Sequence, residues 1–314
     1  MGVPVALNES LSGVDVSAID YPAFLPAAFT QLTESTSIAL GQTIQQTAIN
    51  TPITTEPILT TYVRQGSGNI PILLIHGFDS SILEFRRLIP LLSEHHDTCA
   101  VDLLGFGFTA RPAGITFNKV NIKTHLYHFW QTQINQPVIL VGASMGGAAA
   151  IDFTLTYPQS VEKLILIDSA GFLGSSPLVK FMFPPLDAWA TNFLRSPNIR
   201  QNISRAAYKD KTFATLDAQI CASLHLEHPE WSKALIAFTK SGGYSAFKLS
   251  EMAAIQQPTL ILWGDDDRIL GTKDAKKFQQ VIPNSQLIWI ENSGHVPHLE
   301  KSQVTAKHIL EFCK

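Results

Sequence analysis

The chain has 314 residues, of which 45% are hydrophobic and 16% are charged, and its formal net charge is −3. This share of apolar residues is enough to bury a sizeable core and excludes a disordered chain. No cluster of Lys and Arg runs along the sequence, so we do not expect nucleic acid as a partner. The cysteines Cys99, Cys221 and Cys313 are scattered without metal-ligand spacing, which predicts no metal site or cofactor and suits a reducing, cytoplasmic compartment.

Residues 1–60 are predicted to be an extension that packs on the core. No Lys or Arg precedes Arg64, so the basic start of a secretory signal is missing, and Ala6 stands where a myristoylation signal needs Ser or Thr. No run of about 18 apolar residues predicts a membrane span. Apolar residues between positions 26 and 49 recur at helical spacing and predict a helix on the core; a helix in contact with a membrane surface is the alternative.

Short apolar runs alternate with helical patterns along the rest of the chain. Continuous apolar runs are typical of strands buried on both faces of a mostly parallel sheet, and they occupy residues 70–75, 98–101, 137–141, 164–167, 259–263 and 287–290. The sequence therefore predicts an α/β fold with helices on both faces of the sheet, formed by residues 61–170 and 256–314. Residues 171–255 contain only helix-like pieces and are predicted to be an inserted helical cap.

The segment Gly142-Ala143-Ser144-Met145-Gly146 lies between one of these apolar runs and a helical pattern of small residues. A serine in a sharp turn from strand to helix has a strained backbone, and small residues two positions before and after it let the strand and helix approach closely. Gly142 and Gly146 meet this requirement. The pattern predicts that Ser144 is a nucleophile whose hydroxyl stands clear of the sheet.

A serine nucleophile needs a histidine to accept its proton and an acid to hold that histidine in the correct tautomer. Residues 263–268 and 293–300 each follow a predicted strand, so both lie at the carboxyl edge of the parallel sheet, where Ser144 also lies. The first segment offers three neighbouring aspartates and the second offers His295. We expect structural roles for the other nearby or helical histidines, which are His298, His125 and His128.

The oxyanion of a tetrahedral intermediate needs hydrogen-bond donors. The backbone N–H of Met145 comes with the turn, and the second donor is expected from a loop after an early strand. The loop His76-Gly77-Phe78-Asp79 follows such a strand, Gly77 allows close approach, and the N–H of Phe78 is the candidate donor. We expect the imidazole of His76 to hold this loop by hydrogen bonds.

Several segments stand in a characteristic order along the chain, namely His76-Gly77-Phe78, Asp102-Leu103-Leu104-Gly105-Phe106-Gly107, Gly142-Ala143-Ser144-Met145-Gly146-Gly147, Trp263-Gly264-Asp265-Asp266-Asp267 and Gly294-His295. In this order they resemble the landmarks of the α/β-hydrolase superfamily, in its branch with a serine nucleophile. The resemblance implies the α/β-hydrolase fold and a triad of Ser144, Asp267 and His295, because similar relatives carry the acid at the third position after Trp-Gly. Asp265 and Asp266 stand beside Asp267 and are rivals for the role of the acid, although both could equally be solvated turn residues. Asp168 is the main alternative, because it occupies the place that some members use for the acid.

The whole chain is also similar to cyanobacterial and chloroplast α/β hydrolases, which share a stretch like His76-Gly77-Phe78-Asp79-Ser80-Ser81 followed by Leu83-Glu84-Phe85-Arg86-Arg87. The expected function is hydrolysis of a small-molecule carboxylic ester with an apolar acyl or alcohol group. A C–C bond hydrolase acting on vinylogous diketones is the first alternative, although Asp79-Ser80-Ser81 departs from the Gly-rich loop of those enzymes. A binding protein without activity is the second. The predicted cap residues Phe181, Phe183 and Trp189 are expected to line an apolar substrate pocket.

Overall fold

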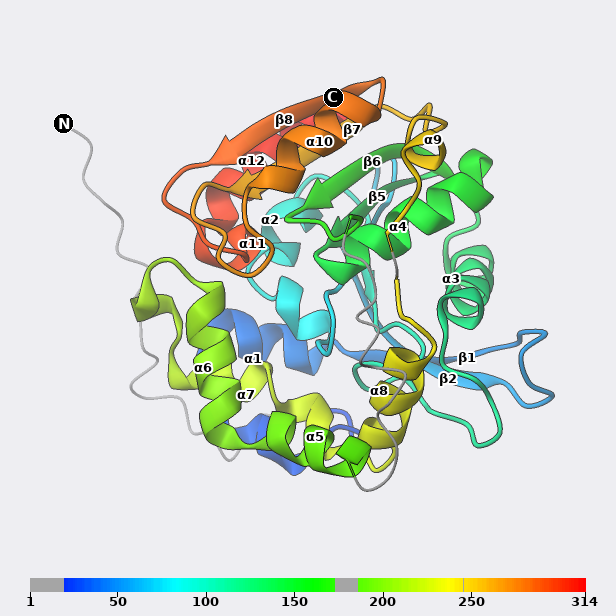
Figure 1. Ribbon diagram of the computed structural model, residues 1–314. Helices are drawn as coiled ribbons and strands as arrows, with labels where there is room; N and C mark the ends of the chain where they lie inside the picture. The colour runs from blue at the N-terminus through cyan, green and yellow to red at the C-terminus, as the bar shows by residue number, and fades with distance from the viewer. Residues whose placement is uncertain (1–19, 173–185, 245) are drawn as a thin grey trace.

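The computed structural model of the chain describes residues 20–172, 186–244 and 246–314 (Figure 1). Within these residues the strands form one sheet in the order β1-β2-β4-β3-β5-β6-β7-β8. Pairing is antiparallel between β1 and β2 and between β2 and β4, and parallel between all other neighbours, so the prediction of a mostly parallel sheet is confirmed. The strands are β1 (Gln45–Ile49), β2 (Ile58–Gln65), β3 (Ile72–Ile75), β4 (Thr98–Val101), β5 (Val138–Ala143), β6 (Val161–Ile167), β7 (Thr259–Gly264) and β8 (Ser285–Ile290).

The central strands are buried on both faces. Every residue of β3, β4, β5 and β7 is buried, and consecutive residues contribute to opposite layers. In β3, Leu73 and Ile75 belong to one hydrophobic cluster, while Ile72 and Leu74 belong to the other. This is why the sequence of these strands shows continuous apolar runs instead of an alternation of apolar and polar residues.

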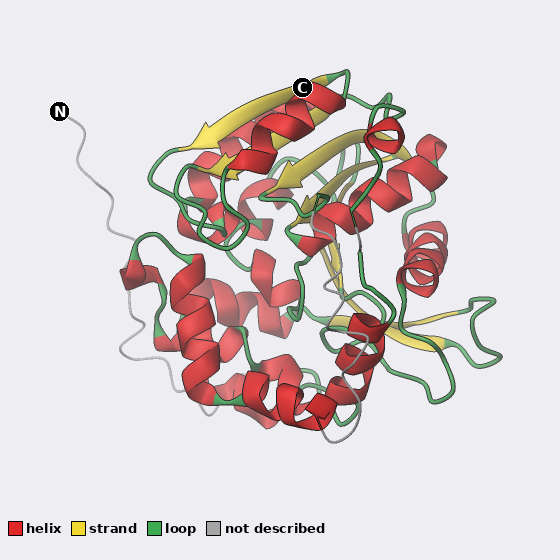
Figure 2. Ribbon diagram, in the orientation of Figure 1, coloured by secondary structure: helices red, strands yellow, loops and turns green. Residues whose placement is uncertain are grey.

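Helices cover both faces of the sheet (Figure 2). On the face of Leu73 lie α3 (Lys119–Gln133), α4 (Met145–Thr156) and α10 (Lys273–Val281), whose phenylalanines join the same cluster. On the face of Ile72 lie α1 (Ser35–Gln42), α2 (Ile89–Ser93) and α12 (Ser302–Cys313). The two clusters together form the core that holds the carboxyl ends of the strands in place.

The N-terminal part differs from the helix predicted between residues 26 and 49. Helix α1 ends at Gln42, and the following residues Gln45–Ile49 form strand β1, which pairs with β2. Gly41 packs so closely under Tyr21 that an added Cβ would lie 2.8 Å from its ring. The apolar residues of this region belong to three short elements, the 3-10 helix η2 (Ala27–Gln31), α1 and β1. Gln45–Ile49 form a strand because pairing with β2 satisfies their backbone groups.

The chain leaves the sheet after β6 and returns at β7. Between them lie α5 (Leu186–Arg195), α6 (Pro197–Ala207), α7 (Leu216–Cys221), α8 (Trp231–Lys240) and α9 (Leu249–Met252). Helix α5 contacts α6 and α8, α6 contacts α7, and the four lie below strands β5 to β8 in the view of Figure 1. We call α5 to α8 and the turns between them the cap helices. None of the helices in the described part of the chain is long and apolar enough to cross a membrane.

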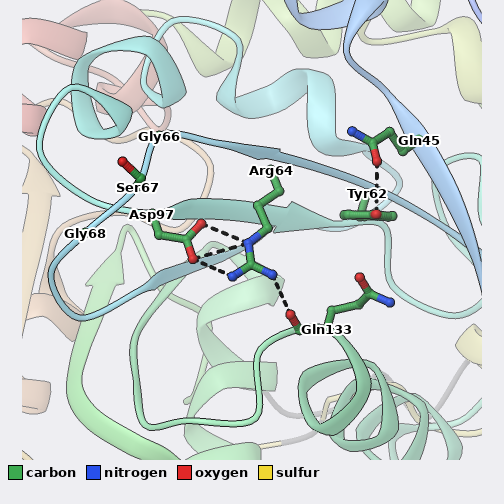
Figure 3. Close-up of a pocket in the computed structure, with 8 residues that line it drawn as sticks. All are labelled: Gln45, Tyr62, Arg64, Gly66, Ser67, Gly68, Asp97 and Gln133. Carbon is green, nitrogen blue, oxygen red and sulfur yellow. Dashed lines mark hydrogen bonds and ion pairs between the residues drawn. The ribbon is translucent and has the colours of Figure 1, made fainter.

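A polar hollow of about 480 Å³ lies at the amino ends of the parallel strands, where β2 meets the start of β4 (Figure 3). Arg64 extends into it and donates hydrogen bonds to both carboxylate oxygens of Asp97 and to the carbonyl oxygen of Gln133. Because its guanidinium is already engaged, we interpret the hollow as a structural feature. It lies at the opposite end of the parallel strands from Ser144, which follows the carboxyl end of β5.

Candidate active site

Ser144 lies in a sharp turn between β5 and α4. Its φ of 53° and ψ of −118° place it in a region that residues with a side chain rarely adopt. A Cβ on Gly142 would lie 2.3 Å from the carbonyl oxygen of Gly146, and a Cβ on Gly146 would lie 2.1 Å from that of Ile75. The two glycines therefore let the strand and helix approach closely enough to leave the Ser144 hydroxyl at the carboxyl edge of the sheet.

Two further side chains meet at Ser144. His295 lies between β8 and α11 (Pro297–Glu300), and Asp267 follows β7. The Nε2 atom of His295 is 3.0 Å from the Oγ atom of Ser144, and its Nδ1 atom is 2.9 Å from the Oδ2 atom of Asp267. The structure thus joins the three residues of the predicted triad by two hydrogen bonds, although they come from three different loops.

Asp267 is held as a charged acceptor. Its Oδ1 atom accepts hydrogen bonds from the N–H groups of Ile269 at 2.7 Å and Leu270 at 3.1 Å. Burial alone would raise the pKa of its carboxyl, but the hydrogen bonds from His295 and from these N–H groups lower it. A charged Asp267 requires a proton on Nδ1 of His295, which leaves Nε2 free to accept the Ser144 hydroxyl proton.

The alternative acids make other contacts. Asp265 accepts a hydrogen bond from the N–H of Ser293, and Asp266 forms an ion pair with Arg268. Asp168 is fully buried and accepts a hydrogen bond from the N–H of Gly264 at 3.0 Å. Burial, and then the negative charge of Asp267, raise the pKa of Asp168 well above its ordinary value.

Asp168, Asp267 and His295 have potential metal-ligating atoms within 4.8 Å of one another, and no other such group is found in the described ranges. Two of these atoms already form the hydrogen bond between Asp267 and His295. The raised pKa of Asp168 opposes metal binding, because a carboxyl has to lose its proton to bind a metal ion. The arrangement suits proton transfer better than metal binding.

The loop after β3 lies against Ser144. A Cβ on Gly77 would be 3.3 Å from the Cβ of Ser144. The N–H of Leu103 donates to Nε2 of His76, so the ring proton lies on Nδ1 and is donated to the carbonyl oxygen of Gly77 at 2.8 Å. Burial lowers the pKa of His76 to about 4, which keeps the ring neutral. His76 therefore ties the loop to the end of β4, as the sequence predicts.

The two predicted oxyanion donors are available. Among the residues that the structure describes, neither the N–H of Phe78 nor that of Met145 donates a hydrogen bond to another protein group. Met145 is the first residue of α4, where N–H groups lack partners within the helix. Phe78 follows Gly77 and Met145 follows Ser144, and Gly77 contacts Ser144, so the two N–H groups belong to neighbouring parts of the site.

A protein-family model described as the alpha/beta hydrolase fold matches residues 70–302. The chain belongs to the α/β-hydrolase family. The chain is 29% identical to the alpha/beta hydrolase domain-containing protein VTE7 of Arabidopsis thaliana, over 93% of this chain and 90% of that protein. It is 26% identical to Lipase 1 of Psychrobacter immobilis, over 78% of each chain. It is 27% identical to a 2-hydroxy-6-oxo-2,4-heptadienoate hydrolase of Pseudomonas putida, over 79% of this chain and 90% of that one.

The structure of this α/β hydrolase assigns contacts beside the site to two residues, Glu84 and Asp79, for which the sequence predicted no role. Glu84 accepts a hydrogen bond from the N–H of Gly77 at 2.8 Å, and its other oxygen lies 3.1 Å from Nε2 of the buried His298. Burial alone would raise the pKa of Glu84, but His298, His76 and the Gly77 N–H lower it to about 2. The sequence feature that could have identified Glu84 is its charge inside the apolar segment Ile82-Leu83-Glu84-Phe85. The second residue, Asp79, contacts the cap helices.

The predicted substrate-binding residues are only partly described. Phe181 and Phe183 lie outside the described residues. Trp189 lies on α5, is 67% exposed and stacks on Phe193. Beside the Gly77 loop, the ring of Phe78 is 46% exposed and packs against the buried rings of Phe106 and Phe238. Phe78 is therefore an exposed aromatic side chain next to Ser144, and it rests on buried rings from the loop after β4 and from α8.

Proposed function

We propose that this α/β hydrolase cleaves carboxylic esters with an apolar acyl or alcohol group through an acyl-enzyme on Ser144. The observation that carries the proposal is the hydrogen-bond chain from Ser144 through His295 to a charged Asp267. A serine hydroxyl is a weak nucleophile near neutral pH, and this arrangement is the one that activates it. The strained turn supports the same role, since strain of this kind persists where the surrounding structure enforces it.

The first half of the reaction forms the acyl-enzyme. Oγ of Ser144 attacks the carbonyl carbon while its proton passes to Nε2 of His295. The carbonyl electron pair moves to oxygen, and the N–H groups of Phe78 and Met145 hold the resulting oxyanion. The ester C–O bond then breaks as His295 gives its proton to the departing alcohol, and the acyl group stays on Ser144.

The second half releases the acid. Water gives a proton to Nε2 of His295 and attacks the acyl carbon, which forms a second oxyanion at the same two N–H groups. Collapse of this intermediate breaks the bond to Oγ, and His295 returns the proton to Ser144. Asp267 stays charged throughout and stabilises the imidazolium that forms in each half.

An apolar substrate is supported by the surface beside Ser144. Phe78, Phe106 and Phe238 form an aromatic cluster next to the predicted oxyanion donors, and Met145 is nearly buried. We propose that Phe181, Phe183 and Trp189 also bind the apolar part of the substrate. The similarity to Lipase 1 supports an ester substrate. The free thiols of Cys99 and Cys221 support a reducing compartment, the cytoplasm.

Cleavage of a C–C bond is the alternative, and the similarity to the heptadienoate hydrolase favours it. Such a reaction would use the same serine and histidine. The Asp79-Ser80-Ser81 sequence after Phe78 differs from the Gly-rich loop expected for C–C hydrolases, which is why we rank ester hydrolysis first.

The test combines active-site labelling with a series of substrates. A fluorophosphonate should label the wild type and not Ser144→Ala, whereas Ser93→Ala, on the far helix α2, should be labelled at the wild-type rate. On p-nitrophenyl esters, each added methylene should raise kcat/KM by up to about fourfold, the equivalent of about 0.8 kcal/mol, until the pocket is full. Labelling of Ser144→Ala at the wild-type rate would exclude the proposed nucleophile. Efficiency that falls from acetate upward, together with turnover of a vinylogous diketone, would favour the C–C reaction.

A further inference from the structure

Asp79 follows the predicted oxyanion donor Phe78 directly and is buried, with a φ of 50°. Its Oδ1 atom accepts a hydrogen bond from Nε1 of Trp231 at 2.7 Å and lies 3.1 Å from Nε2 of His225. Its Oδ2 atom accepts a hydrogen bond from the guanidinium of Arg200. One carboxylate in the loop beside Ser144 is therefore surrounded by three side chains from the cap helices.

These three partners come from different parts of the cap. Arg200 lies on α6, His225 lies in the short helix η7 (Leu224–Glu227), and Trp231 begins α8. Burial alone would raise the pKa of Asp79, but the hydrogen bond from His225 and the charge of Arg200 lower it well below its ordinary value. Asp79 is thus a buried charge whose hydrogen-bond partners, among the described side chains, belong to the cap, so loss of the charge would leave Arg200 without this ion pair.

Helix α8 contacts both residues of the Phe78-Asp79 pair. Trp231 and Phe238 are seven positions apart, about two helical turns, and therefore lie on the same face of α8. Trp231 donates to Asp79, and the ring of Phe238 lies 6.2 Å from the ring of Phe78. On the other side of Phe78, the N–H of Gly77 is held by Glu84. The residues before and after Phe78 are therefore both held, Gly77 by Glu84 of the core and Asp79 by Trp231 of the cap.

We propose that Asp79 is a positioning residue, through which the cap helices orient the N–H of Phe78 toward Ser144. The inference rests on the proposed function, in which that N–H stabilises the oxyanion. It predicts that cap contacts at Asp79 act on the transition state more than on substrate binding. The cap thereby takes part in the chemistry through the backbone, in addition to covering the site.

The test compares two carboxylates of similar burial. Asp79→Asn keeps the shape of the side chain and tolerates a positive φ, but removes the charge. Trp231→Phe keeps a ring and removes one donor. The control is Asp217→Asn on α7, because Asp217 is also buried and accepts hydrogen bonds from Thr33 and Glu34, away from the Phe78 loop.

For Asp79→Asn, kcat on a p-nitrophenyl ester should fall on the order of 10- to 100-fold, because a displacement of about 1 Å can cost about 100-fold. KM should stay within about threefold, and binding of a trifluoromethyl ketone, which forms a tetrahedral adduct, should weaken by the same factor as kcat/KM. Trp231→Phe should lose about threefold to tenfold in kcat. Asp217→Asn should lower the melting temperature with little change in kcat.

Hydrogen exchange supplies a readout that does not depend on activity. The amides of residues 76–83 should exchange faster in Asp79→Asn than in the wild type and should be unchanged in Asp217→Asn. Unchanged exchange and kcat in Asp79→Asn, or equal losses of kcat in both Asn variants, would overturn the inference. If the wild type is not labelled by a fluorophosphonate, the proposed function fails, and the exchange measurement alone decides whether Asp79 fixes the loop.

Discussion

Ser144 keeps its unfavourable backbone conformation because neighbouring strands and turns bind its peptide groups. A residue in such a region carries strain of about 1–3 kcal/mol. The N–H of Ser144 donates to the carbonyl of Ile167 at the end of β6, and its carbonyl accepts from the N–H groups of Gly147 and Ala170. These bonds hold the residue from both sides, so the side chain keeps its direction whether or not His295 is present.

The acid can be assigned by comparing three substitutions. Asp267→Asn should lower kcat on the order of 10⁴-fold, because an amide in that place favours the wrong tautomer of His295. Asp265→Asn should cost little, since Asp265 is partly exposed and binds the backbone of Ser293. Asp168→Asn should also retain most activity, because Asp168 accepts a hydrogen bond from the backbone of Gly264 and does not hold Nδ1 of His295. Steady-state kinetics checks all three, and a larger loss in Asp168→Asn than in Asp267→Asn would move the acid to β6.

At the scale of elements, the N-terminal segment is attached to the core by an ion pair between Glu34 and Arg87 as well as by apolar contacts. Glu34, which precedes α1, accepts hydrogen bonds from Nε of Arg87 at 2.6 Å and from Nη2 of Arg87 at 2.7 Å. Burial alone would raise the pKa of Glu34, but Arg87 and Arg86 lower it from 4.5 to about 2. Glu34 thus joins the start of α1 to the residues after the Gly77 loop.

This ion pair predicts a pH-dependent contribution to stability. A carboxyl whose pKa is lower in the folded state stabilises fully above its unfolded value, and the stabilisation disappears as the pH falls through the folded value. Glu34→Gln should therefore lower the free energy of unfolding by about 1–2 kcal/mol at pH 7 and by almost nothing near pH 2. Urea titrations at the two pH values measure this, with the exposed Glu230→Gln as control. An equal loss at both pH values would mean that packing, not charge, explains the effect.

The sequence predicted the buried strands better than the edge. Strands β3, β4, β5 and β7 and residues 164–167 of β6 are largely apolar runs because both faces are covered, and their pattern was visible without a structure. Strand β1, with the residues Gln45-Gln46-Thr47-Ala48-Ile49, lies at the edge of the sheet and is only partly buried, so its sequence carries no such run. Ser144 and His295 were predicted from the glycine-flanked turn and from the strand ends that they follow, whereas Asp267 was chosen among three neighbouring aspartates through the family resemblance. Asp79 and Glu84 act through contacts with distant residues, Trp231 and His298, that spacing along the chain does not reveal.

At the scale of the molecule, two buried thiols report on different parts of the fold. Cys99 lies in β4 and Cys221 lies in α7 of the cap, and burial raises the pKa of each to about 12. Cys313 is only partly buried. Cys221 packs in the same hydrophobic cluster as residues of the sheet, which couples this part of the cap to the core.

We therefore expect Cys99 and Cys221 to become reactive together. In a Cys313→Ser background, a thiol reagent should modify neither cysteine of the folded protein, and pulse labelling along a urea gradient should modify both at the same urea concentration. Mass spectrometry of the peptides identifies each site. Labelling of Cys221 at a lower urea concentration than Cys99 would show that the cap separates from the sheet before the core unfolds.

The contact of Gly146 with β3 has a consequence for how this fold can change its specificity. Gly146, two residues after Ser144, touches the carbonyl oxygens of Ile75 and His76, so an added Cβ would lie 2.1 Å and 2.5 Å from them. Backbone atoms of the turn that carries the Ser144 hydroxyl thus pack directly against backbone atoms at the start of the loop that carries the Phe78 N–H. Cap side chains other than Arg200, His225 and Trp231, which bind Asp79, can be exchanged for new substrates while Ser144 keeps its place beside the Gly77 loop, because the contact of Gly146 with β3 belongs to the sheet.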